Sequence, residues 1–325
     1  MSDIFSLAAQ NLSSPIILSF ALGALAALAR SDLTIPEAAA KAMSIYLLFA
    51  IGFKGGVSVV DHGVDANLAL ALLTGALLSA TLPLIAFGLL QIMTGLSRVD
   101  AAAVAAHYGS ISIVTFVAAS SVLEGSGIAS EGYMVAVAAV MEAPAILSAL
   151  WLVSSGGASG RMDKDLWREI LLNGSIVLLI GAFVIGWISG QDGLRDIQSF
   201  IVSPFKGVLC LFLLDMGLVA GRGLRSAGAN LRPGVLAFGA LMPLVGCTFG
   251  LAAAWFLGLS LGGTVLLMVL SASASYIAVP AAMRVALPEA NPSIYLTLSL
   301  GITFPFNLTL GIPLYLALAQ AVIGP

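Results

Sequence analysis

The amino-acid sequence predicts an all-α polytopic membrane protein with ten transmembrane helices, arranged as two inverted five-helix repeats. The first observation is composition: of the 325 residues, 60% are hydrophobic and 9% are charged, and the mean hydropathy is +1.08. Soluble domains do not have this composition. The second is that polar breaks interrupt two apolar segments, the fourth and the ninth. The third is that similar motifs occur in the same order in the two halves of the chain.

Apolar segments long enough to cross a bilayer follow one another along the whole chain. A crossing helix needs about 20 residues. We predict spans near residues 15–30, 38–57, 67–92, 100–121, 131–154, 169–189, 196–220, 233–258, 261–285 and 294–322. Several segments are short or interrupted by Pro or Gly, so counts of nine and eleven stay open as alternatives. The repeat favours ten.

The positions of Lys and Arg predict how the chain is oriented. The loops after the odd-numbered spans hold ten of the thirteen basic residues, whereas Arg195 lies on the opposite side and Lys54 and Lys206 lie within spans. Because cytoplasmic loops are enriched in Lys and Arg, we expect a multi-pass protein of the cell (inner) membrane with both termini outside the cytoplasm. The ten residues are Arg30, Lys41, Arg98, Arg161, Lys164, Arg168, Arg222, Arg225, Arg232 and Arg284.

The two halves match with a slowly drifting offset. Corresponding motifs are 165 residues apart in spans 2 and 7, 163 apart at the breaks and 161 apart in spans 5 and 10. Because each half has an odd number of spans, the second is upside down relative to the first. We predict a first repeat over 1–154, a cytoplasmic linker over 155–168 and a second repeat over 169–325. Matching pairs are Ile51 with Met216, Ser110 with Ser273, Ser112 with Ser275, Tyr133 with Tyr295, and Glu142 with Thr303.

Polar stretches interrupt spans 4 and 9 at corresponding places, where residues 108–112 read YGSIS and residues 271–275 read SASAS. Matching breaks of this kind are typical of the binding site of a secondary transporter. The N–H groups at each restarted helix carry partial positive charge and attract anions. The alternative is that the serines only bend packed helices. The predicted substrate-binding residues are Gly109, Ser110, Ser112, Ser273, Ser275 and Tyr276.

A coupling cation is expected beside the anion, because serine hydroxyls donate to anions and accept from cations. Glu142 precedes Pro144, which frees a carbonyl next to the carboxylate, and Thr303 and Asn307 flank Pro305 in the partner span. We predict Na⁺ and no other metal, because the cysteines have no His or Cys at ligand spacing. The alternative is a proline kink satisfied by neighbouring polar groups. The predicted sodium-binding residues are Ser112, Glu142, Ser273, Thr303 and Asn307.

Two further charged side chains are predicted inside spans, where charges are costly and are candidates for function. Lys54 lies near the non-cytoplasmic end of span 2, and Asp215 lies in the middle or cytoplasmic half of span 7. Either the two form a structural pair, or Lys54 extends outward to the interface and Asp215 serves the coupling ion. His107 abuts the first break, where a lone His is usually a local hydrogen-bond partner.

These features predict a secondary active transporter that takes up a small anion with Na⁺ by alternating access. A cation/proton antiporter is one alternative, and it would use Glu142 or Asp215 because neither break contains a carboxylate. A small-carboxylate symporter also fits an anion site made of dipoles and hydroxyls. No enzyme is predicted, because neither histidine has a catalytic or metal-binding set beside it. Nucleic acid is not an expected partner, because there is no basic patch.

Several motifs resemble the SbtA family of sodium-dependent bicarbonate transporters. They are residues 35–38 (IPEA), 51–56 (IGFKGG), 109–112 (GSIS), 283–293 (MRVALPEANPS) and 311–315 (GIPLY). The resemblance covers nearly the whole chain. It implies ten helices in two inverted repeats, a homotrimer in the plasma membrane, and Na⁺-coupled bicarbonate uptake where broken helices 4 and 9 cross. The wider architecture is similar to that of bile-acid/sodium symporters and sodium/proton antiporters.

The chain departs from the family pattern at two places. The family has Ser-Ser-Ser-Asp in the second break, whereas residues 273–276 read SASY here, so one carboxylate is missing. The family position that corresponds to Glu142 is also acidic, which favours a role there. The long insertion that ties family members to a PII-like regulator is replaced by the short segment 154–165. We therefore do not expect a PII-like partner.

Overall fold

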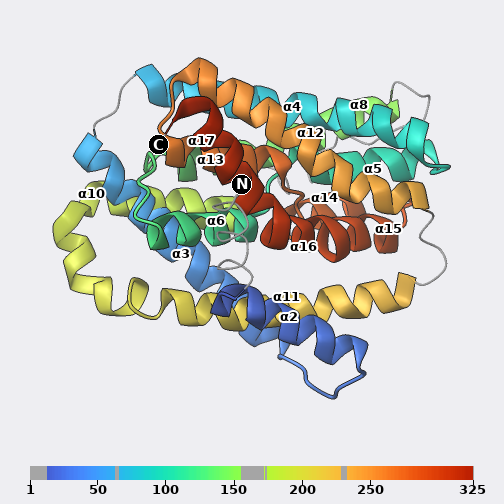
Figure 1. The fold of residues 1–325 in the computed structure, drawn as a ribbon, viewed down its shortest axis with the longest axis horizontal. Helices are drawn as coiled ribbons and strands as arrows, with labels where there is room; N and C mark the ends of the chain where they lie inside the picture. The colour runs from blue at the N-terminus through green and yellow to red at the C-terminus, as the bar shows by residue number, and fades with distance from the viewer. Residues whose placement is uncertain (1–12, 63–65, 155–171, 173, 228–232, 325) are drawn as a thin grey trace.

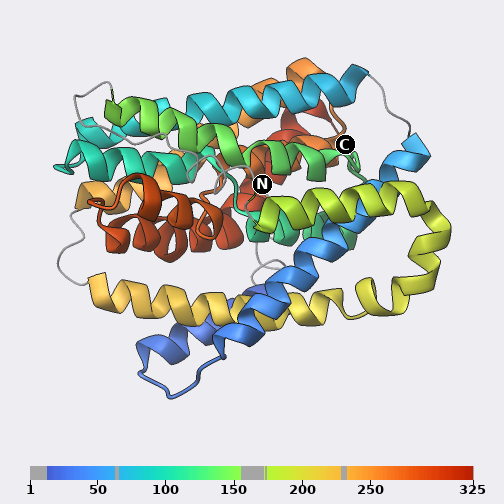
Figure 2. The same cartoon turned by 180° about the vertical axis from the view of Figure 1, so that it is seen from behind.

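The structure is a computed structural model that describes residues 13–62, 66–154, 172, 174–227 and 233–324. Within these ranges it consists of helices joined by turns and loops, without strands. The long helices run roughly side by side along the longest axis of the molecule (Figures 1 and 2). The predicted linker over 155–168 lies outside the described residues.

Eight helical segments in the described part of the chain are long and apolar enough to cross a membrane, which confirms the multi-pass class. They occupy predicted spans 2 to 8 and 10. Predicted span 1 is the shorter helix α2 (Pro15–Leu28), and predicted span 9 begins with the shorter helix α13 (Leu261–Ala272). The count of ten spans and the inverted repeat stay predictions.

Four helices pack along one side of the molecule, and we call them the side bundle (Figure 2). Within it α2 packs against α11 and α3 against α10. Glycines bring the backbones close: a Cβ on Gly23 would lie 2.0 Å from the carbonyl oxygen of Leu214, and one on Gly56 would lie 1.9 Å from that of Phe183. Small residues of this kind are typical of helix contacts in membranes. The side bundle is α2, α3 (Glu37–His62), α10 (Gly174–Ile201) and α11 (Phe205–Ala227).

The remaining helices form the crossing bundle, which contains both predicted breaks (Figure 1). The apolar window found within residues 98–125, the predicted span 4, is entirely buried inside the protein. Its polar break is therefore shielded from lipid, as irregular backbone at membrane depth requires. The bundle consists of α4 (Ala66–Met93), α5 (Arg98–Gly109), α6 (Ile113–Gly125), α7 (Met134–Val140), α8 (Glu142–Ser154), α12 (Pro233–Leu257), α13, α14 (Ala278–Ala286), α15 (Pro292–Leu296), η2 (Thr297–Thr303), α16 (Phe304–Phe306), η3 (Asn307–Gly311) and α17 (Ile312–Ile323).

The predicted boundary between spans 6 and 7 is wrong. Residues 196–201 were assigned to span 7, but they belong to α10, and α11 begins only at Phe205. The reason is Gly190, which has φ 59° and ψ −153° and so lets the chain turn sharply and resume a helix at once. The turn directs the end of α10 toward α11 (Figure 1).

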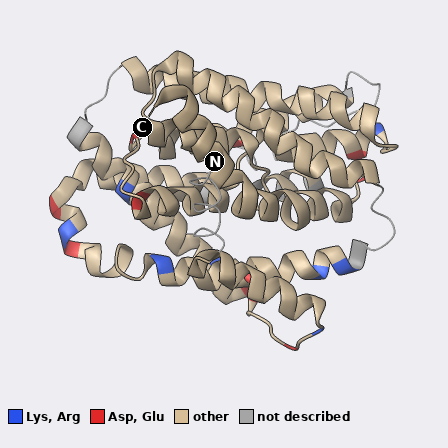
Figure 3. Cartoon of the chain, viewed as in Figure 1, with Lys and Arg blue, Asp and Glu red and all other residues tan. Residues whose placement is uncertain are grey.

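Charged side chains lie mostly at the helix ends and bends, and the middle of the bundle is nearly free of them (Figure 3). Glu142 and Asp215 are exceptions, since both are buried. Charges inside a membrane-spanning bundle are costly unless they are paired or serve an ion. Their surroundings therefore indicate where function is located.

Candidate functional site

The break in predicted span 4 separates α5 from α6 at Ser110, Ile111 and Ser112. Ser112 caps α6, because its Oγ accepts hydrogen bonds from the backbone N–H of Thr115 (3.2 Å) and from the Thr115 hydroxyl (2.8 Å). Serine is favoured at such a position because its side chain replaces a missing helical acceptor. The hydroxyl of Ser110 turns the other way and donates to Glu142 Oε2 (3.2 Å).

The break in predicted span 9 separates α13 from α14, and Ser273 directly after α13 is extended. The carbonyl of Ala272, which the break leaves without a helical partner, accepts a hydrogen bond from Asn307 Nδ2 (3.0 Å). Tyr315 in turn donates to Asn307 Oδ1 (2.7 Å). Because every buried carbonyl needs a donor, Asn307 stabilises the broken end of α13.

The two breaks cross and bond to each other. The N–H of Ser275 donates to the carbonyl oxygen of His107 (2.8 Å). The N–H of Ser112 donates to Ser273 Oγ (2.9 Å), and this hydroxyl donates to the carbonyl of Leu270 (3.0 Å). Ser112 corresponds to Ser275, and His107 to Leu270, at the same offset of 163 residues. The same connection therefore occurs twice, once directly and once through a serine hydroxyl.

A small cavity lies at this crossing. Its volume is about 10 Å³, which is room for roughly one water molecule. The Tyr276 hydroxyl lies beside Ser112 but makes no hydrogen bond of ordinary geometry with any described residue. The cavity therefore combines a carboxylate with hydroxyl groups in a nearly closed space. Its lining residues are Ile111, Ser112, Ile113, Glu142, Ser275, Tyr276 and Ile277.

Glu142 is the first residue of α8 and is only 7% exposed. The Ser79 hydroxyl from α4 donates to the carbonyl of Met141 and accepts from the N–H of Ala145 (3.1 Å), so it replaces one bond of the helical ladder. This insertion fixes the start of α8 and with it the carboxylate. Within the described residues no Lys or Arg forms an ion pair with Glu142. A buried carboxylate without a cationic side chain suits a bound cation.

Thr303 and Asn307 do not line this cavity, although the sequence grouped them with Glu142 as sodium ligands. The Thr303 hydroxyl donates to the carbonyl of Gly239 (2.7 Å) and contacts the Tyr108 hydroxyl (2.7 Å). Pro243, four residues after Gly239, cannot donate to that carbonyl, so Thr303 satisfies the proline kink of α12. Of the predicted sodium set, Ser112 and Glu142 line the cavity, and Ser273 bonds to the N–H of Ser112 beside it. Thr303 and Asn307 donate to backbone carbonyls of α12 and α13.

Predicted span 10 contains two π-helical segments, η2 and η3, on either side of Pro305. Sequence analysis missed them. Pro305 and Gly311 are the residues that could have indicated an irregular helix there, because prolines and glycines mark helix distortions. Short π-helical segments occur frequently at functional sites.

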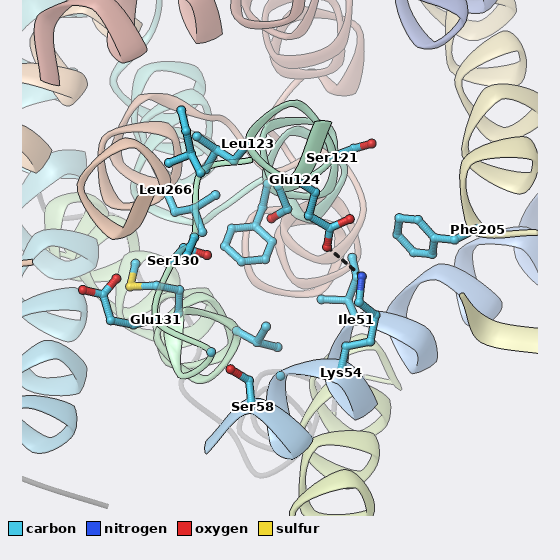
Figure 4. Close-up of a pocket in the computed structure, with 18 residues that line it drawn as sticks. Ile51, Lys54, Ser58, Ser121, Leu123, Glu124, Ser130, Glu131, Phe205 and Leu266 are labelled. Atoms are coloured by element: carbon cyan, nitrogen blue, oxygen red, sulfur yellow. Dashed lines mark hydrogen bonds and ion pairs between the residues drawn. The ribbon is translucent and has the colours of Figure 1, made fainter. Parts of the chain in front are cut away.

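Lys54 and Asp215 do not form the pair that was one of the two alternatives left open by the sequence. Its Nζ lies 2.7 Å from Glu124 Oε1 and 5.4 Å from the centre of the Phe205 ring (Figure 4). Asp215 is buried on α11, where Arg222 acts on it electrostatically. The Lys54–Glu124 pair joins α3 of the side bundle to α6 of the crossing bundle. Sequence reasoning missed Glu124 because it lies at the end of α6, 70 residues away.

Two larger cavities lie between the side bundle and the crossing bundle. The first, which we call the Lys54 cavity, has a volume of about 360 Å³ (Figure 4). The second, the Arg222 cavity, has a volume of about 280 Å³. The Lys54 cavity is lined by Lys54, Ser58, Glu124 and Val135 among others, and the Arg222 cavity by Val219, Arg222, Gly223 and Thr297 among others.

The apolar helices and the two bonded breaks place one buried carboxylate among hydroxyl groups inside a multi-pass membrane bundle, as is typical of a transporter site. The chain belongs to the Na⁺-dependent bicarbonate transporter superfamily, because the family model of that description matches residues 15–320. This confirms the resemblance found in the sequence and the expectation that the protein is a transporter and not an enzyme. Membership implies bicarbonate as the substrate and Na⁺ as the coupling ion. No curated protein matches the chain.

Proposed function

We propose that the protein takes up bicarbonate together with Na⁺ by alternating access, with both ligands bound where the two broken helices cross. The observation that carries the proposal is that Glu142 and residues of both breaks meet around the small cavity at the crossing, which must widen to admit the two ligands. The family membership supports the identity of the two ligands.

The anion is attracted by the two restarted helices. α6 and α14 begin on either side of the crossing, and the N-terminus of a helix carries about +0.5 charge on its free N–H groups. Ser112 and Ser275 add hydroxyl groups that can donate to an oxyanion. Bicarbonate, with one negative charge and three oxygens, suits such a set of donors.

Sodium is attracted by the carboxylate of Glu142 and by the hydroxyl oxygens of Ser112 and Ser275, which line the same cavity. Hard cations prefer oxygen ligands of this kind. The positive helix ends repel Na⁺, so the bound anion and Glu142 together compensate their field. Each ligand therefore binds better when the other is present, and this mutual dependence couples the two fluxes.

Alternating access is supported by the two larger cavities. Lys54 and Ser58 of one cavity correspond to Val219 and Gly223 of the other at the predicted offset of 165 residues. In an inverted repeat, corresponding positions face opposite sides of the membrane. The Lys54 cavity then opens outside and the Arg222 cavity inside.

The remaining features of the proposal are predictions from the sequence. They are ten spans in two repeats over 1–154 and 169–325, a cytoplasmic linker, both termini outside the cytoplasm, and a homotrimer in the cell membrane. The cross-bonded breaks, with equivalent residues 163 positions apart, support the repeat. Ten basic residues in the odd loops support the orientation.

A cation/proton antiporter is the second candidate, because the structure places a carboxylate at the crossing, as such an antiporter requires. An antiporter needs no anion for transport. The two candidates therefore differ in whether Na⁺ flux depends on bicarbonate.

The test is uptake of labelled bicarbonate into proteoliposomes that contain the purified protein. We expect uptake to rise steeply when Na⁺ replaces K⁺ outside at constant ionic strength, and labelled Na⁺ to enter only when bicarbonate is present. Na⁺ flux that is independent of bicarbonate and opposed to proton flux would favour the antiporter. Stronger uptake of acetate or formate than of bicarbonate would favour a small-carboxylate symporter.

A further inference from the structure

His107 makes hydrogen bonds to both the N–H and the carbonyl group of Ser275 in the opposite break. It is in the last turn of α5 and is fully buried. Its backbone carbonyl accepts from the N–H of Ser275 (2.8 Å), and its ring Nδ1 contacts the carbonyl oxygen of Ser275. Because a carbonyl can only accept, Nδ1 carries the proton and donates.

The imidazole ring has a fixed orientation. It stacks on the Tyr295 ring, with 4.7 Å between ring centres and 26° between planes. Nε2 of His107 is buried and has no hydrogen-bond partner in the described part of the chain. The direction of the ring therefore depends on the Nδ1 bond and on the stacking.

This bond determines which way the next peptide group faces. The described chain has no cis peptide bond, and in a planar trans peptide the C=O and N–H groups point in opposite directions. The carbonyl of Ser275 points at His107, so the N–H of Tyr276 points away from it. Ser275 and Tyr276 line the small cavity, and His107 does not. The N–H therefore faces the cavity side.

We infer that His107 is a positioning residue for the anion: it holds the Ser275–Tyr276 peptide so that the cavity receives an N–H donor and not a carbonyl oxygen. The inference rests on the proposed function, because it assumes that bicarbonate binds at the crossing. Without the Nδ1 bond this peptide is free to rotate, and a carbonyl facing the cavity would repel an anion. The corresponding residue of the second repeat, Leu270, has no side-chain donor, so only one break is held in this way.

The experiment compares three variants of His107 in the full-length protein. Asn has its side-chain N–H at the same number of bonds from Cα as Nδ1, Gln has it one bond further out, and Leu has none. We expect His107→Leu to raise the KM for bicarbonate about tenfold or more, as expected for a lost buried hydrogen bond, with little change in kcat. His107→Asn should restore the KM to within about threefold of wild type, whereas His107→Gln should not. The Kd for Na⁺ without bicarbonate should not rise in any of the three, because a carbonyl oxygen that turns toward the cavity attracts a cation.

The outcomes separate the possible failures. If wild-type protein shows no Na⁺-dependent uptake, both the proposed function and this inference are wrong. If wild type is active and His107→Leu keeps its KM for bicarbonate, the inference alone is wrong. If the Asn and Gln variants show an equal rise in KM and equal falls in kcat and thermal stability, His107 only supports the fold. This comparison can be made even if His107→Leu does not fold.

Discussion

Replacing Glu142 by Gln is expected to weaken Na⁺ activation of bicarbonate uptake by about 10- to 100-fold. This is the effect of losing about 1.5–3 kcal/mol, the usual contribution of a hydrogen bond to a charged group. Gln keeps the size of the side chain and an oxygen that accepts from Ser110, so the packing of α8 is preserved. The measurement is the initial rate of bicarbonate uptake as a function of Na⁺ concentration.

Asp192→Asn is the matched control for Glu142→Gln. It also removes one carboxylate, but Asp192 lies on the surface of α10 in an exposed pair with Arg195 (3.0 Å), and such pairs contribute little. We expect its Na⁺ dependence to equal that of wild type. If Glu142→Gln behaves like this control, Glu142 does not bind the coupling ion.

Replacing Gly109 by Ala is expected to destabilise the protein and to abolish most of its transport. A Cβ at this position would lie 2.3 Å and 2.4 Å from two carbons of the Pro83 ring and 2.6 Å from the carbonyl oxygen of Ser79. Neither a proline ring nor the backbone can move easily. The helices must therefore separate, at a cost of about 1–3 kcal/mol.

The loss of transport from this substitution has a structural route. Ser79 lies on the part of α4 that would be displaced, and its hydroxyl holds the start of α8 at Met141 and Ala145. Displacing it moves the carboxylate of Glu142 away from the crossing.

Gly88→Ala on α4 meets no atom within 4 Å and is the control for Gly109→Ala on α5. It should leave uptake unchanged and should not lower the midpoint of thermal unfolding in detergent. If Gly109→Ala retains the wild-type midpoint and uptake, the close contact with Pro83 is unimportant.

Much of the fold could be predicted because the bilayer imposes simple rules. Spans are apolar for about 20 residues, and Gly and Ser inside them mark irregular backbone. The observed breaks, at residues 110–112 and 273–277, overlap the predicted stretches 108–112 and 271–275. Glu142 lines the cavity between them, where a carboxylate in a span is a candidate for function.

What could not be predicted depends on contacts between distant helices. Glu124 pairs with Lys54 because two helix ends meet, and no local pattern contains that information. The sequence predicts Thr303 as a sodium ligand but does not predict its bond to the carbonyl of Gly239, which Pro243 releases on another helix. The hydroxyl of Ser79, which replaces one backbone hydrogen bond of α8, is also far along the chain from its partner Met141. Such partners follow from packing, which a pattern along one helix does not specify.

The central claim is that Na⁺ and bicarbonate bind together at the crossing of the two breaks. Calorimetric titration of the purified protein with bicarbonate, at a series of Na⁺ concentrations and constant ionic strength, tests it most directly. We expect saturating Na⁺ to lower the Kd for bicarbonate, and saturating bicarbonate to lower the Kd for Na⁺ by the same factor, as linkage requires. A bicarbonate Kd that is the same in Na⁺ and in K⁺ would contradict it.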